Sequence, residues 1–137
     1  MIDTIVATLV NDATLAALLT GGVQRAQEIS RQATPGAFDA NLEVKPCALV
    51  KQEMATRWGP LENSGRVYVV VWLYERSGYG SIEAARKRIY ALLHRKQLSG
   101  SVKLYWIEHG NDLLDQEDAA TGWAMIVSRY VCTVERA

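Results

Sequence analysis

Two histidines, His94 and His109, are the candidates in this 137-residue sequence for a base or an imidazole ligand near neutral pH. His109 stands close to Glu108, Asp112 and Asp115, and a histidine beside carboxylates can activate water or hold a metal ion. The same residues are equally typical of a turn that leads into an acidic loop. We expect His94 on the polar side of a helix, exposed to solvent. A small hydrolase that uses His109 and the acidic loop is therefore one alternative.

The segment Gly78 to Glu83 begins like a dinucleotide-binding loop, because two spaced glycines follow a predicted strand and precede a predicted helix. Glu83 occupies the position of the third glycine, where a carboxylate would repel the pyrophosphate. A glycine turn followed by a helix capped at Ser81 explains the segment better. The sequence also lacks the Gly-x-Ser-x-Gly motif of serine hydrolases. We predict no cofactor and no catalytic residue.

The two cysteines, Cys47 and Cys132, lie far apart in the sequence. This spacing is typical neither of a disulfide framework nor of a structural zinc site. We expect both to be reduced, buried thiols, and we predict no metal.

Fifteen basic and fifteen acidic residues cancel, so no overall field attracts nucleic acid or an anionic membrane. The start Met1-Ile2-Asp3 lacks the positive charge of a secretory signal, and the longest apolar stretches are far shorter than the ~20 residues that span a bilayer. With 49% hydrophobic residues, the chain should form one folded cytoplasmic domain over residues 1–137.

Two main helices are expected, and both should pack on one face of the sheet. Apolar residues at helical spacing start at Ile2, a break with a second cap falls at Asn11-Asp12, and Gly21-Gly22 ends the signal. The second helix should run from Ser81 to about Gln97, with one apolar stripe made of Ile82, Ala85, Ile89, Leu92 and Leu93.

Strands are predicted near 23–29, 47–56, 66–75, 102–109 and 122–135, with loops near 30–42, 57–65 and 110–121. The element order is α-β-β-β-α-β-β. Neighbouring strands in sequence favour antiparallel pairing. The fold class is thus α+β, with a mostly antiparallel sheet of four to five strands and two main helices on one face.

The strand from Val67 to Tyr74 is apolar on both faces. Valines and Leu73 on one face suit a core under helices, whereas the other face carries Tyr68, Trp72 and Tyr74, and aromatic residues are enriched in subunit interfaces. We therefore assign these three aromatic residues to a subunit or partner interface. Two structural alternatives stay open: loops fold over the second face, or the helices lie on opposite sides.

The second helix is basic, and the loop near 110–121 is acidic. Solvation of the outer face is the ordinary explanation, and a nucleic-acid groove is disfavoured because the aromatic residues lie elsewhere. A third alternative is a head-to-tail contact between the basic helix of one subunit and the acidic loop of the next. The residues that it would use are Arg86, Arg88, Arg95, Asp112, Asp115 and Asp118.

The chain resembles the small tail-terminator, or tail-completion, proteins encoded in the neck gene cluster of long-tailed phages and prophages. The residues that carry this resemblance cover nearly the whole chain, in the following order: Leu18-Leu19 before Gly21-Gly22, the strand Val67 to Trp72 leading through Gly78 and Gly80, the helix from Ile82 to His94, and a long last strand after an acidic loop.

This resemblance implies a ring, expected to be a hexamer, that caps the tail tube and joins it to the head connector. The implied partners are the protein itself, a tail-tube protein and a head connector protein, without nucleic acid, membrane or cofactor. The implied location is the host cytoplasm during assembly and then the virion. The hairpin tip Trp58 to Gly65 and the loop Ser30 to Asn41 should project contacts. A head-completion or connector adaptor is the alternative within the same class.

Overall fold

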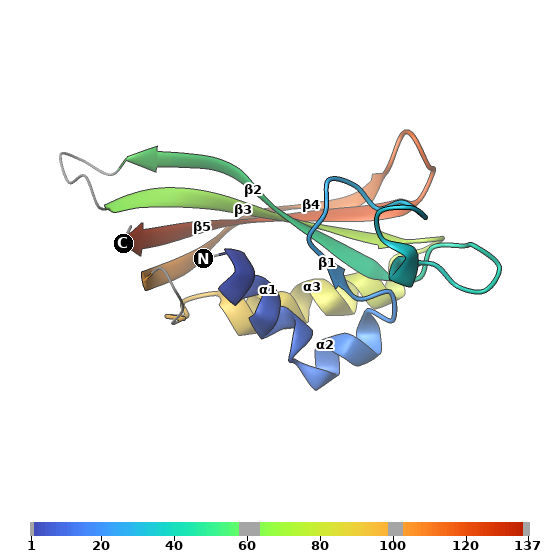
Figure 1. Cartoon of the computed structure of the whole chain (residues 1–137), viewed down its shortest axis with the longest axis horizontal. Helices are drawn as coiled ribbons and strands as arrows, with labels where there is room; N and C mark the ends of the chain where they lie inside the picture. The colour runs from blue at the N-terminus through green and yellow to red at the C-terminus, as the bar shows by residue number, and fades with distance from the viewer. Residues whose placement is uncertain (1, 58–63, 99–102, 136–137) are drawn as a thin grey trace.

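The computed structural model describes residues 2–57, 64–98 and 103–135, which form a five-stranded sheet with helices on one face (Figure 1). In chain order the elements are α1 (Ile2–Val10), α2 (Ala13–Leu18), β1 (Val23–Gln24), a short 3-10 turn (Pro35–Ala37), β2 (Cys47–Arg57), β3 (Ser64–Glu75), α3 (Gly80–Leu93), β4 (Lys103–Glu117) and β5 (Ala124–Glu135). None of the described helices is long and apolar enough to cross a membrane.

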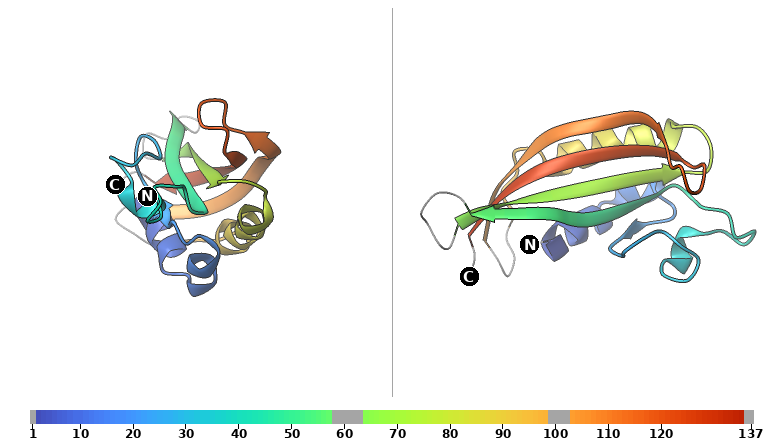
Figure 2. Two further views of the ribbon diagram at one scale, coloured as in Figure 1. Left: turned by 90° about the vertical axis from the view of Figure 1, so that its right-hand side faces the viewer. Right: turned by 90° about the horizontal axis from the view of Figure 1, so that it is seen from above.

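The strands lie in the order β1-β2-β3-β5-β4. Only β1 is parallel to its neighbour, pairing Val23 with Ala48 of β2, and the three other pairs are antiparallel. The end view in Figure 2 shows all three helices on the same side of the sheet. The predicted α+β class with a mostly antiparallel sheet is therefore confirmed.

The expected break in the N-terminal helix falls between α1 and α2. Asp12 caps α2, since its Oδ2 accepts a hydrogen bond of 2.9 Å from the Leu15 amide. In α3 the predicted apolar stripe is buried except for Leu92, which is half-buried, and the helix ends at Leu93 and not near Gln97. Arg95 adopts a positive φ of 56°, and its amide donates to the carbonyl of Ile107 at 2.7 Å, so the chain turns there onto β4.

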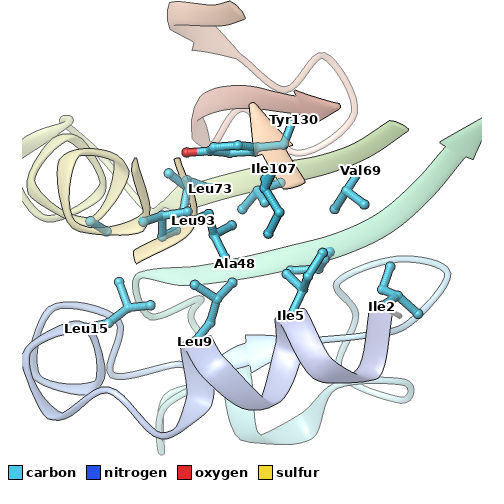
Figure 3. Close-up of a cluster of buried hydrophobic side chains, with 14 of the residues drawn as sticks. Ile2, Ile5, Leu9, Leu15, Ala48, Val69, Leu73, Leu93, Ile107 and Tyr130 are labelled. Carbon is cyan, nitrogen blue, oxygen red and sulfur yellow. The ribbon is translucent and has the colours of Figure 1, made fainter. Parts of the chain in front are cut away.

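The core lies between the helices and one face of the sheet (Figure 3). Val69 and Leu73 of β3 and Tyr130 of β5 point into it, opposite Ile5 and Leu9 of α1. The valine and leucine face of β3 is thus the helix-packed face, as the sequence predicted. It follows that the aromatic face of β3, with Tyr68 and Trp72, is the outer face of the sheet.

Several predicted boundaries are wrong. The strand expected over 23–29 shrinks to Val23–Gln24, and the expected acidic loop near 110–121 is mostly strand, because β4 continues to Glu117. Shifts in the pairing of β4 with β5 at three places interrupt the alternation that would have marked this strand. The hairpin between β2 and β3 is supported by the pairing of Arg57 with Gly65, whereas Trp58 lies outside the described residues.

Candidate interaction surfaces

The centre of the outer face is partly covered by the protein's own charged side chains. Val70 is fully buried there, with Lys51 of β2 and Arg129 of β5 as its neighbours across the sheet. Nε of Arg129 lies 3.3 Å from a carboxylate oxygen of Glu53 on β2, so this ion pair spans β3. The ammonium of Lys51 lies 5.8 Å from the ring centre of Trp72. The long side chains of Lys51, Glu53 and Arg129 therefore cover part of the apolar face, while their charged ends remain in water.

Tyr68 and Trp72 are half-buried on this face and remain accessible from outside. Tyr68 pairs across the sheet with Met54, which is 53% exposed. Met54 and Tyr68 lie side by side on this face, and Trp72 lies beyond Val70 along β3; we call these three residues the outer strip. The sequence had assigned Tyr68 and Trp72 to an interface, and this placement leaves them available for one.

Tyr74 has a different environment, because the loop before β2 folds over its end of the sheet. Its ring contacts Trp123 edge to face, with 5.8 Å between ring centres, and Trp123 in turn lies 6.0 Å from Phe38. These rings pack on a small second core made of Ala37, Val44 and Cys47. At this end the alternative in which a loop covers the second face is correct, so Tyr74 is occupied within its own chain.

The charges on the second helix and in the acidic segment largely meet within one chain. Nη1 of Arg86 lies 2.9 Å from Oδ2 of Asp112, and Arg86 also contacts Glu83. Arg88 binds both carboxylate oxygens of Asp12, at 2.6 and 2.9 Å. Arg86, Arg88 and Asp112, which the sequence assigned to a contact with a neighbouring subunit, thus already make ion pairs within their own chain.

The remaining residues of that predicted contact are dispersed. Arg95 lies 3.9 Å from a carboxylate oxygen of Glu108, and both side chains are well exposed. Asp115 is exposed in β4 with a positive φ of 50°. The carboxylate of Asp118 accepts hydrogen bonds from the amide and hydroxyl of Thr121, at 3.2 and 2.5 Å, and so closes the turn before β5.

His109 belongs to a polar network between α3 and β4. Its Nε2 lies 2.8 Å from Oδ1 of Asp112, and its amide donates to Nδ1 of His94 at 2.9 Å. His94 also stacks on Tyr90, so its predicted position as a solvated surface residue is wrong.

The hydrolase alternative finds little support in this network. The nearest serine across the sheet from Asp112 is Ser128, which is 1% exposed and out of reach of a substrate. In the described part of the chain, no three His, Cys, Asp or Glu side chains are grouped so that they could hold a metal ion. The contacts of His109 account for it as a structural residue that ties the edge strand to the helix.

Sequence reasoning missed an exposed apolar group on the edge strand. Trp106, Leu113 and Leu114 of β4 are 41 to 45% exposed. We call these three residues the β4 edge group. The Leu113-Leu114 pair within a run of acidic residues was the available signal, because two adjacent leucines are unusual in a solvated loop.

No family model matches the sequence, and no curated protein matches it significantly. The fold, however, matches a chain in the solved structure described as "Virion of native gene transfer agent (GTA) particle". The TM-score is 0.77 with 16% sequence identity, over 97% of this chain and 92% of that chain. At this identity the match shows that the two chains share a fold along nearly their whole lengths.

Proposed function

We propose that this protein is a structural subunit of a phage-like virion, and specifically a ring-forming tail terminator. The observation that carries the proposal is the fold shared, over 97% of the chain, with a component of a gene transfer agent virion. The order of sequence features that resembles tail-terminator proteins is an independent argument for the same role. A terminator acts by binding and shape, so this proposal assigns no catalytic residue.

Two separate apolar surfaces suit a ring. The outer strip lies over β2 and β3, whereas Leu113 and Leu114 lie on β4 at the far edge of the sheet. When two different surfaces of one subunit meet head to tail, the contact is heterologous, and it closes into a ring if the rotation between subunits allows. We place the outer strip of one subunit against the β4 edge group of the next.

The proposed partners are a tail-tube protein on one side of the ring and a head connector protein on the other. A head-completion adaptor, which would bind between portal and tail, needs the same ring and is the second candidate. Co-purification separates the two roles: a terminator should retain the tail-tube protein in the absence of head proteins, whereas an adaptor should retain a head protein without the tube.

The ring itself is tested by the mass of the purified protein in solution, measured by light scattering, together with electron micrographs. We expect a closed oligomer, a hexamer by the resemblance, in equilibrium with the monomer. Trp72→Ala should shift the equilibrium toward the monomer while the circular dichroism spectrum is retained. A protein that stays monomeric at every concentration, both alone and mixed with tail-tube protein, contradicts the proposal.

A further inference from the structure

A cavity of about 250 Å³ opens on the outer face at the end of the sheet covered by the loop before β2. Four segments form it: the chain after β1, the outer sides of β2 and of β3, and the turn between β4 and β5. Figure 2 shows this loop and this turn at the same end of the sheet. We call it the aromatic cavity, because Trp72, Tyr74 and Trp123 line it.

The aromatic rings give the cavity a surface that attracts cations. The faces of aromatic rings carry negative electrostatic potential, strongest for tryptophan. Tyr74 meets Trp123 edge to face, at an interplanar angle of 74°, so the two rings present differently oriented surfaces. The ammonium of Lys51, 5.8 Å from the centre of the Trp72 ring, already exploits this potential. The protein's own lysine thus indicates the kind of ligand that the rings favour.

Carboxylates make the cavity acidic as a whole. Glu28 and Asp118 line it together with Lys51, which leaves one net negative charge. Glu28 is exposed, and within the described residues its carboxylate makes no ion pair. Burial is the main cause that raises the pKa of Tyr74 to about 12, and the negative charge of Asp118 adds to this rise.

A second cavity, of about 300 Å³, lies on the other side of Ile29 and Trp123 and has the opposite charge balance. Arg31 and Arg76 line it with Glu43, and Arg76 is neutralised by Glu43 at 2.6 Å. One positive charge therefore remains, on Arg31. A cationic ligand is favoured in the aromatic cavity and disfavoured in its neighbour.

We infer that the aromatic cavity is a recognition site for an arginine side chain of a partner protein. Arginine suits it better than lysine, because its planar guanidinium stacks on aromatic rings while its N–H groups donate to carboxylates. The site would hold a single side chain of an exposed partner segment, as an anchor within a larger contact. Every residue that lines it comes from one chain, so the site is complete within a single subunit.

The test is a titration with a short capped peptide, Gly-Ser-Arg-Ser-Gly, followed by tryptophan fluorescence. The control peptide replaces arginine by citrulline, which keeps the shape and removes the charge. We expect the arginine peptide to bind roughly two- to fivefold more tightly than the citrulline peptide. Equal response to both peptides, or no response to either, overturns the inference.

Two variants locate the binding site by shifting affinity in opposite directions. Glu28→Gln should weaken arginine binding roughly two- to fivefold, while Lys51→Met, which removes the competing internal cation, should strengthen it by a similar factor. Asp115→Asn is the matched control, because it removes one exposed carboxylate outside the cavity and should leave binding unchanged. A control that weakens binding as much as Glu28→Gln does would mean that net charge alone governs the response, and it contradicts the site. Because oligomeric mass is measured separately, an intact ring without arginine binding removes only this inference.

Discussion

Arg86 of α3 and Asp112 of β4 form an ion pair, 2.9 Å between Nη1 and Oδ2, that joins the helix to the edge strand within one chain. The other oxygen of Asp112 lies 2.8 Å from Nε2 of His109, so the carboxylate is held between two cationic or polar partners. Both side chains of the pair are less than one-fifth exposed. The edge strand is thus attached to the helix layer by charge as well as by apolar contact.

Arg86→Met should destabilise the protein, because the methionine keeps the apolar part of the side chain but leaves Asp112 without its cation. We expect a loss of about 1–3 kcal/mol in the free energy of unfolding, measured by urea denaturation. Lys87→Met, at an exposed position of the same helix, should change stability by less than about 0.5 kcal/mol. Equal stability of the two variants would show that the ion pair contributes nothing.

The stability of the protein should depend on pH through the carboxylate of Asp112. Burial raises the pKa of Asp112, but the hydrogen bonds with His109 and Ser128, and to a lesser extent the charges of His109 and Arg86, outweigh it, so the pKa falls below its ordinary value of 3.8. A group with a lowered pKa in the folded state contributes stability above its ordinary pKa, and that contribution is lost as the pH falls through the folded value. Urea midpoints should therefore drop below pH 4 more steeply in the native protein than in Arg86→Met.

Asp12 should contribute through two separable interactions. It caps α2 and binds Arg88, and the hydrogen bond with Arg88 is the main cause that lowers its pKa to about 2. Asp12→Asn keeps a capping oxygen but loses the charge, whereas Asp12→Ala loses both. We predict that Asp12→Ala lowers the melting temperature more than Asp12→Asn at pH 7, and that the gap between Asp12→Asn and native protein closes toward pH 2. A constant gap over this pH range would exclude the ion pair as its cause.

The sequence predicted those features that depend on residues close together in the chain. Helical spacing placed the buried stripe of α3, and the two-faced pattern of β3 separated the valines that face the helices from Tyr68 and Trp72. The pairing of Arg86 with Asp112 joins residues 26 positions apart, so only the tertiary fold reveals it. Bulges hid the second half of β4 because they break the alternation on which strand prediction depends.

The β4 edge group should matter more for assembly than for folding. Leu113 and Leu114 are 44% and 45% exposed, so replacing both by serine removes part of the monomer's buried apolar area and should cost about 1–3 kcal/mol of stability. In the proposed ring the double variant should also shift the mass distribution toward the monomer, measured by light scattering, while the circular dichroism spectrum shows that the fold is retained. Leu42→Ser, at a 54% exposed position in the loop before β2, is the matched control and should assemble normally.

The two cysteines should be unreactive in the folded protein. Both are free and buried, as predicted from the sequence, and burial raises the pKa of each thiol to about 12. The thiolate is the reactive form, so almost none is present at pH 8. Iodoacetamide should leave the native protein unmodified and label both Cys47 and Cys132 in urea, measured by mass spectrometry. Rapid labelling of either cysteine without denaturant would contradict their buried positions.

The backbone after α2 lies close to the chain just before β2. Gly21 follows α2, and its amide donates to the carbonyl of Pro46 at 2.8 Å just before β2 begins. A Cβ at position 21 would lie 2.9 Å from the Cβ of Cys47 and 3.0 Å from the oxygen of Pro46. Neither atom belongs to a flexible side-chain end, so the backbone itself would have to move.

Gly21→Ala should therefore destabilise the protein by about 1–3 kcal/mol, as overpacking does in a core, with the loss measured by urea denaturation. Gly36→Ala is the matched control, because no heavy atom lies within 4 Å of a Cβ built there. In that variant the alanine restricts the unfolded chain without a clash, so stability should stay the same or rise slightly. If Gly21→Ala were as stable as Gly36→Ala, the junction between α2 and β2 would be looser than the fold described above requires.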